Sequence, residues 1–166
     1  MIKSTSILSA KVVVTLLITF QTSSAESESY YQYEPFTLSF TGPNVSELGE
    51  INPFLDYRLD VTFVCEGRSL KVPGYFAADG NAAETSADAG DQWHVNFAAD
   101  EPGEWQYSVS FRQGKNVAVS VASVNSRPIE GVDGEQGTIR IQPARSGPYA
   151  DGRLQYVGEH YLRYSG

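Results

Sequence analysis

Hydrophobic and polar residues alternate along most of the chain after residue 34, and this period of two predicts β-strands with one buried face and one solvent-facing face. In the clearest stretch, Tyr57–Cys65, every second residue is apolar and the residues between are mostly polar. Further strands are predicted over residues 36–40, 69–72, 93–97, 105–111, 117–121 and 138–141. Short turns rich in Gly, Pro, Asn and Asp separate them, so an all-β fold is expected.

The number and spacing of these strands predict an antiparallel immunoglobulin-like β-sandwich of about seven to eight strands. A closed barrel with a similar number of strands is the alternative. The strands that carry Trp93 and Trp105 are joined by a short turn at 100–103, which predicts a hairpin. Aromatic residues in phase with the buried face are expected in the core, namely Phe63, Trp93, Phe97, Trp105, Tyr107 and Phe111.

The first 25 residues differ from the rest of the chain and are typical of a secretory signal peptide. Lys3 and Lys11 precede a mostly apolar run of nine residues, 12–20, and small residues follow at Ser23 and Ala25. A run of that length is much shorter than the roughly 18 residues of a membrane-spanning helix. We therefore expect an exported protein with no membrane association after cleavage.

Charge and cysteine content exclude several classes of protein. The chain has 12 basic and 20 acidic residues, a net charge of −8, and removal of Lys3 and Lys11 with the leader makes it −10. A surface of this sign repels polyanions, so we expect no nucleic-acid partner. The single cysteine, Cys65, cannot form an internal disulfide and is expected to be a buried thiol. His94 and His160 lack metal-ligand spacing, and no metal or cofactor is expected.

Residues 77–91 break the alternation and are expected to form a long acidic loop. The order Asp79-Gly80-Asn81 followed by two alanines does not match a calcium-binding loop of the EF-hand type. A catalytic carboxylate pair needs a spacing across a cleft that a loop sequence cannot establish. A solvated loop with a docking or glycan-contact role is the preferred interpretation, and its candidate residues are Asp79, Asn81, Glu84, Thr85, Asp88 and Asp91.

Three ordered motifs link the chain to a family. They are NPFLDYRLDVTF at 52–63, VPGYFAADGNAAETSA at 72–87 with Trp93 following, and PGEWQYSVSFRQG at 102–114. Together they resemble the immunoglobulin-like N-terminal domain of unknown function that precedes the catalytic (β/α)₈ barrel in bacterial secreted glycoside hydrolases. The resemblance extends over roughly residues 34–166. Cys65 is not a recognised part of that pattern.

Together with the leader at 1–25, the resemblance implies a secreted or periplasmic bacterial protein. The same resemblance implies an N-terminal linker (26–33), a β-sandwich (34–145) and a segment (146–166) whose end, 161–166, leads as a first strand toward a barrel. It also implies that the chain is a non-catalytic accessory domain, that the longer parent is a polysaccharide-degrading glycoside hydrolase, and that the catalytic barrel and polysaccharide are the partners. A free-standing carbohydrate-binding module is the alternative, and it predicts at least two exposed aromatic rings on one face. An independent hydrolase would instead need a pocket with convergent carboxylates. Tyr30, Tyr31 and Tyr33 are candidate ligand contacts or a frayed terminus.

Overall fold

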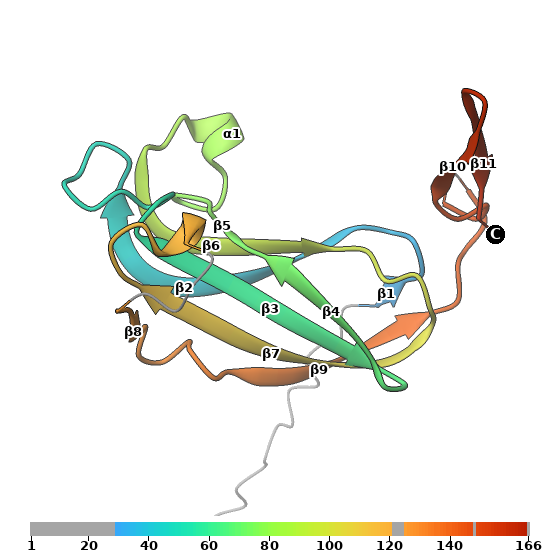
Figure 1. Ribbon diagram of the computed structural model, residues 1–166, viewed down its shortest axis with the longest axis horizontal. Coiled ribbons are helices and arrows are strands. Elements are labelled where there is room, and N and C mark those ends of the chain that lie inside the picture. Colours follow the sequence, from blue (N-terminus) through green and yellow to red (C-terminus); the bar gives the residue numbers. More distant parts are fainter. Residues whose placement is uncertain (1–28, 121–124, 148, 166) are drawn as a thin grey trace, which may run out of the picture.

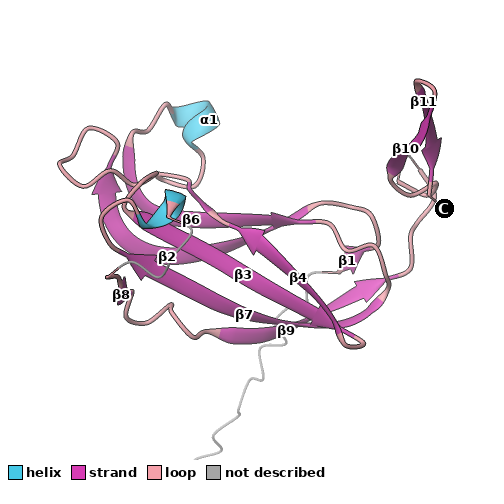
Figure 2. Ribbon diagram, viewed as in Figure 1, coloured by secondary structure: helices cyan, strands magenta, loops and turns pink. Residues whose placement is uncertain are grey.

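The computed structural model describes residues 29–120, 125–147 and 149–165 of the 166-residue chain. These residues form an all-β sandwich of two sheets, and a separate hairpin stands beside it (Figures 1 and 2). The only helical elements in the described part are α1 (Ala82–Thr85) and the 3₁₀ turn η1 (Val117–Val119), and neither is long enough to cross a membrane. The predicted signal peptide lies outside the described residues.

The larger sheet has the strand order β1–β9–β7–β3–β4, and β8 pairs with one end of β7. Every pair in it is antiparallel except β1 and β9, which are parallel. Its strands are β1 (Tyr30–Tyr31), β3 (Tyr57–Cys65), β4 (Arg68–Pro73), β7 (Gly103–Gln113), β8 (Arg127–Pro128) and β9 (Gln136–Gln142). The alternation in β3 and β7 places one set of side chains in the core and the other on the outer face.

The smaller sheet has the order β2–β6–β5, with antiparallel neighbours throughout. Its strands are β2 (Phe36–Ser46), β5 (Tyr75–Phe76) and β6 (Ala89–Phe97). The sequence predicts that the first strand ends at Phe40, but β2 continues to Ser46. Its register with β6 shifts between Thr41 and Val45, so the Gly-Pro segment forms a bulge and does not end the strand.

The two tryptophan-bearing strands do not form the predicted hairpin. β6 pairs with β2 and β5, whereas β7 pairs with β3, β8 and β9 in the other sheet. The residues between β6 and β7 therefore cross from one sheet to the other. Both strands face the same core from opposite sides, which gives the same in-phase aromatic pattern that a hairpin would give.

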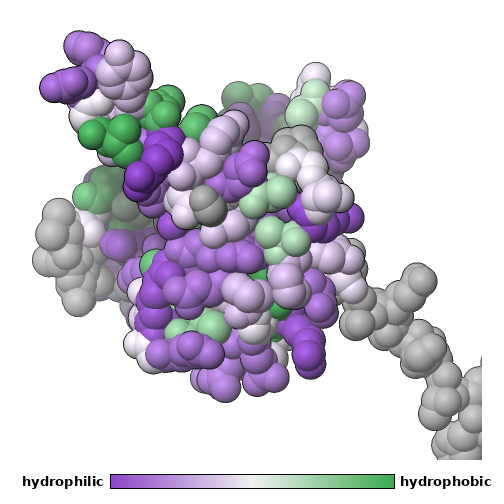
Figure 3. Space-filling view, turned by 90° about the vertical axis from the view of Figure 1, so that its right-hand side faces the viewer, coloured by the Kyte–Doolittle hydropathy of each residue, from purple (hydrophilic) through white to green (hydrophobic). Residues whose placement is uncertain are grey.

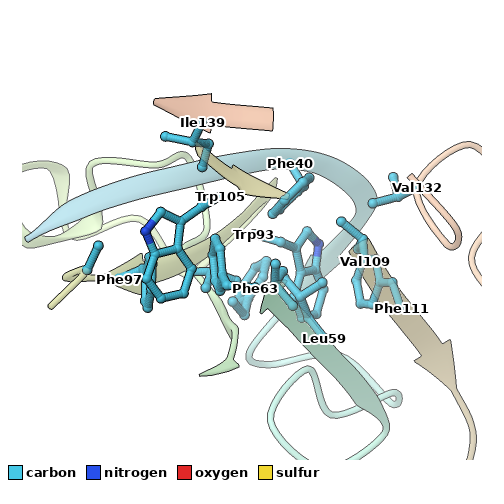
Figure 4. Close-up of a cluster of buried hydrophobic side chains, with 14 of the residues drawn as sticks. Phe40, Leu59, Phe63, Trp93, Phe97, Trp105, Val109, Phe111, Val132 and Ile139 are labelled. Carbon is cyan, nitrogen blue, oxygen red and sulfur yellow. The ribbon is translucent and has the colours of Figure 1, made fainter. Parts of the chain in front are cut away.

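The core lies between the sheets and is built mainly from aromatic side chains (Figure 4). Trp105, Phe63 and Phe111 are completely buried and Trp93 is 2% exposed. Phe63 stacks on Phe97 across the sheets, with ring centroids 4.0 Å apart. Burying each such side chain contributes about 1.5–3 kcal/mol before conformational entropy is subtracted.

Tyr107, which belongs to the predicted core set, is only partly buried. Its ring lies against Gly137 on β9, where an added Cβ would be 2.5 Å from the ring. The absence of a side chain at Gly137 therefore makes room for the ring of Tyr107 at the margin of the core. Cys65 is a buried, free thiol, and burial raises its pKa, as do Glu66 and Glu101.

Several predicted features differ from the structure. Within the described residues the two sheets have six and three strands, and three of these, β1, β5 and β8, have only two residues each. The sheets remain separate, so the closed-barrel alternative is wrong. Residues 117–119 form η1 where a strand is predicted; Val117 is buried but Val119 is 65% exposed. A 3₁₀ helix has three residues per turn, so residues two positions apart face different directions and only one of the two valines reaches the core.

The segment before the sandwich is attached to it. Residues 30–31, which the sequence assigns to a linker, form β1 and pair with Ile141 and Gln142 of β9. Arg145 donates two hydrogen bonds to the carboxylate of Glu34, at 2.6 and 2.7 Å, and its guanidinium lies 4.6 Å from the centre of the Tyr31 ring. These contacts hold the start of the sandwich to the segment that follows β9.

Candidate docking surface

A two-stranded hairpin, β10 (Leu154–Gly158) and β11 (Tyr161–Tyr164), projects beyond one end of the sandwich (Figure 1). Its strands are antiparallel, with Leu154 opposite Tyr164 and a register shift after Tyr156. The turn between them uses three consecutive residues with positive φ, Gly158, Glu159 and His160. Where the sequence predicts a single strand at the end of this segment, the structure has a hairpin.

The hairpin exposes more large apolar side chains than it covers. Six of its residues are between 49% and 70% exposed: Leu154, Tyr156, Val157, Tyr161, Leu162 and Tyr164. On the face of the molecule at this end, most of the surface is hydrophilic and the strongly hydrophobic residues gather in its upper part (Figure 3). An isolated two-stranded hairpin is marginal in water, and a gathered apolar surface of this kind is typical of a contact site.

A cluster of charged residues attaches the hairpin to the sandwich. Arg153, immediately before β10, donates to Asp100 Oδ2 at 2.8 Å, and Arg68 of the sandwich donates to the same oxygen at 2.5 Å. Arg68 also pairs with Glu101 at 3.0 Å. Asp100 is mostly buried, and its other oxygen, Oδ1, has no hydrogen-bond partner among the described residues.

The environment of Asp100 keeps it ionised. Burial alone would raise the pKa of its carboxyl, but the hydrogen bond and positive charge of Arg68, with a contribution from Arg153, lower it below the ordinary value. At neutral pH the carboxylate therefore holds both guanidinium groups. The base of the hairpin is closed by a second contact, in which Ser165 and Arg153 exchange two hydrogen bonds of 2.9 and 3.0 Å.

The acidic loop predicted at 77–91 is shorter than expected, because α1 forms within it and β6 begins at Ala89. Asp79 accepts the backbone N–H of Asn81 at 2.8 Å, and the hydroxyl of Thr85 and this backbone bond lower its pKa. These bonds form a local Asx-type turn.

The remaining loop candidates have separate positions. Glu84 lies in the first turn of α1, the backbone oxygen of Asp88 accepts the N–H of Glu47, and Asp91 Oδ1 accepts from Gln92 at 2.8 Å. In the described residues, no group of three or more His, Cys, Asp or Glu side chains is arranged to hold a metal ion. The loop acids thus act singly and do not converge on a centre.

The other candidate residues also have structural neighbours. Tyr30 packs on Phe36 with ring centroids 4.1 Å apart, so it belongs to the sandwich and is not a frayed end. His94 is half-buried with its ring edge-on to Tyr75 at 5.8 Å, and burial lowers its pKa.

The sequence predicts a linker and one strand for residues 146–166, so the hairpin residues are not among the predicted site residues. Leu154 and Tyr156 alternate with polar residues, and a Gly-containing turn precedes Tyr161. These two signals indicate a hairpin when they are considered together.

The chain was compared with curated proteins, solved structures and family models. No curated protein matches it. A solved structure described as a "putative glycoside hydrolase from Bacteroides vulgatus ATCC 8482" is similar, with a TM-score of 0.53 and 25% sequence identity over 83% of this chain. The match spans only 20% of that protein's chain. A family model described as "Domain of unknown function (DUF5060)" matches residues 29–112, which is just over half of the chain. The chain therefore belongs to the DUF5060 family.

Proposed function

We propose that the chain is a non-catalytic accessory domain of a secreted, polysaccharide-degrading glycoside hydrolase, and that it packs on the catalytic barrel through the hairpin β10–β11. The observation that carries the proposal is the exposed apolar surface of this hairpin, attached to the sandwich through Arg153 and Asp100. The similar glycoside hydrolase supports it, because the matched part is one fifth of that chain and leaves room for a separate catalytic domain. The immunoglobulin-like character of the sandwich belongs to the same proposal.

The energetics of the hairpin favour a permanent contact. Complete burial of one large apolar side chain contributes about 1.5–3 kcal/mol, and the six exposed hairpin side chains each retain about half or more of their surface for such burial. Several kcal/mol then remain to offset the loss of freedom when two domains pack. Covalent connection reduces that loss further, because the partner is held at high effective concentration.

The hairpin, not the acidic loop, is the docking surface in this proposal. The loop that carries α1 lies toward the opposite end of the sandwich from the hairpin (Figure 1). Its acids are engaged in local turns or lie apart from one another. One compact neighbour would therefore meet the hairpin and leave the loop uncovered.

Export is the remaining part of the proposal. The leader-like segment 1–25 supports passage across a bacterial membrane, and the acidic balance of the rest suits a protein in solution outside the cytoplasm. A polysaccharide too large to enter the cell is degraded in this compartment. Fusion of residues 1–25 to a reporter enzyme should give export and cleavage after Ala25, whereas retention of the reporter in the cytoplasm would contradict this part.

Hydrogen exchange tests the docking. The reading frame that contains this chain is expressed to its natural end, and amide exchange is compared with that of the 166-residue chain. Residues 154–164 should exchange at least tenfold more slowly in the longer protein, and residues 77–88 should exchange equally in both. Equal exchange of the hairpin in both proteins, or the absence of any further domain in the reading frame, would refute the proposal.

A matched pair of substitutions separates docking from general surface effects. Leu162→Asp on the hairpin should abolish the protection of residues 154–164 in the longer protein, because burial of an unpaired carboxylate is costly. Leu48→Asp, at a residue 84% exposed in the loop before β3, should leave it unchanged. Equal effects of the two variants would argue against a specific interface.

A further inference from the structure

A groove of about 290 Å³ opens between the loop before β3, the first half of β3 and the β4–β5 connection. It is separate from the hairpin and from the acidic loop, and it combines exposed aromatic rings with charged groups. The residues that matter for its chemistry are Phe54, Arg58, Asp60, Tyr75, Phe76 and Trp93.

Two aromatic rings at this groove are available to a ligand. Phe54 is 51% exposed and Tyr75 is 43% exposed, and both line the same hollow. The buried rings of Phe76 and Trp93 lie behind Phe54, with the Phe54 and Phe76 centroids 6.2 Å apart and those of Phe76 and Trp93 5.1 Å apart. Tyr75 is held by other neighbours: its ring packs edge-on to His94 at 5.8 Å, and its hydroxyl accepts from Asn96 Nδ2 at 3.3 Å. Exposed rings on a rigid base lose little conformational freedom when a ligand covers them.

The polar wall of the groove is also rigid. The Asp60 side chain is 10% exposed, and its Oδ2 atom accepts Arg58 Nε at 2.8 Å and pairs with Lys71 Nζ at 3.1 Å. Arg58 Nη1 donates to the backbone oxygen of Ser120 at 3.2 Å, which fixes the plane of the guanidinium. Both ion pairs use Oδ2, so within the described part of the chain Asp60 Oδ1 is left as an acceptor and Arg58 Nη2 as a donor.

This combination matches the two sides of a sugar ring. The C–H face of a pyranose is apolar and packs on an aromatic ring. Its hydroxyl groups can donate hydrogen bonds to a carboxylate and accept them from a guanidinium. A wholly apolar ligand would cover the charged wall without replacing its water, which is costly. The volume, about 290 Å³, is just below the range for sites that take drug-sized molecules, about 300–1,000 Å³, and suits one or two sugar rings.

We infer that this groove binds one or two sugar rings of a polysaccharide, with Phe54 and Tyr75 as stacking platforms and Arg58 and Asp60 as hydroxyl contacts. The choice of a sugar among small polar ligands rests on the proposed function. The groove and the hairpin involve different elements, so a docked catalytic domain would leave the groove open. The chain would then hold a polysaccharide strand outside the catalytic centre.

Calorimetric titration of the purified 166-residue chain tests the inference. The probes are hexasaccharides of β-1,4-glucose, β-1,3-glucose, β-1,4-mannose, β-1,4-xylose, galactose and galacturonic acid. At least one should bind, and Phe54→Ala and Tyr75→Ala should each weaken that binding by tenfold or more. Two cations surround one carboxylate, so the galacturonic acid probe tells whether the groove prefers an acidic sugar.

The chain offers a matched control. Tyr149 is 44% exposed, nearly the same as Tyr75, and does not line the groove. Tyr149→Ala should bind the hexasaccharide as the unmodified chain does. Phe54→Tyr, which keeps the ring, should retain binding within about threefold and shows that loss in Phe54→Ala comes from the platform and not from misfolding.

Each outcome decides the inference. Failure of all six probes to bind, or equal losses for Tyr75→Ala and Tyr149→Ala, would overturn it. These results leave the docking proposal untouched, since hydrogen exchange of the hairpin does not involve the groove. Conversely, saccharide binding by a chain whose hairpin shows no docking would leave a carbohydrate-binding module without a catalytic neighbour.

Discussion

Gly42 lies under the indole of Trp93, and substituting it by alanine should destabilise the sandwich measurably. A Cβ at this position would be 2.6 Å from Trp93 Cδ1 and 2.8 Å from both Trp93 Nε1 and Phe111 Cε1. Ordinary carbon contacts are about 3.5–4.0 Å, so the rings must move by about 1 Å. The hydrogen bond from Trp93 Nε1 to the Pro43 oxygen, 3.3 Å long, would lengthen with them.

The magnitude follows from two opposing effects. Overpacking of a core costs about 1–3 kcal/mol, whereas replacing glycine by alanine at a compatible backbone conformation recovers about 0.4–1 kcal/mol by restricting the unfolded chain. The net loss in the free energy of unfolding for Gly42→Ala is therefore about 1–2 kcal/mol. With a urea dependence of about 2 kcal/mol per molar, the unfolding midpoint falls by about 0.5–1 M.

Urea unfolding followed by tryptophan fluorescence is a suitable assay, because both tryptophans of the chain are core residues. Thr41→Ala, at an exposed neighbour on the same strand, should change the free energy of unfolding by less than about 0.5 kcal/mol. If Gly42→Ala unfolds at the same urea concentration as Thr41→Ala, the indole does not lie against Gly42 as described.

Three further predictions concern the core and the charged cluster. Phe63→Ala removes a completely buried ring stacked on Phe97 and should cost about 3–5 kcal/mol in urea unfolding; a loss below 1 kcal/mol would contradict the packing. Asp100 has a lowered pKa, so its stabilising contribution is present above the ordinary value near 4 and is lost as the pH falls through the lowered value. Stability should accordingly decrease more steeply below pH 4 in the unmodified chain than in Asp100→Asn, and parallel curves would exclude this role. Arg153→Ala should speed hydrogen exchange of the hairpin severalfold while changing the free energy of unfolding by less than about 1 kcal/mol, because the arginine is 58% exposed; unchanged exchange would show that the ion pair does not hold the hairpin.

The strands with one wet face were predictable because their period of two survives into the structure. This holds for β3, β6 and β7, whose buried apolar residues are those in phase. The sheet to which β6 belongs was not predictable, because the chain between β6 and β7 can turn back or cross the core with the same sequence pattern. The strands that pair with β6 through backbone hydrogen bonds lie elsewhere in the sequence, and the alternation within β6 does not predict which strands these are.

The candidate sites were less accessible to sequence reasoning than the core. Phe54 lies in a loop and Tyr75 in a two-residue strand, so neither has a periodic neighbour that distinguishes exposed from buried rings. Conversely, the acids of residues 77–91 are close in sequence but point to separate local bonds. Proximity along a loop indicates a shared site only when the backbone brings the side chains to one side.

The parallel pairing of β1 with β9 has a consequence for how the chain acquires its structure. Glu34 and Arg145 form an ion pair next to these two strands and are 111 positions apart in the sequence. Contacts so distant in sequence form slowly, because a long loop must close before they give any stabilisation. During synthesis β7 is made before β9, so the edge of β7 that pairs with β9 stays unpaired until β9 has been made. A polypeptide cut between these two strands would keep that edge open to self-association, so late completion of the larger sheet is the step at which the folding chain is most exposed to aggregation.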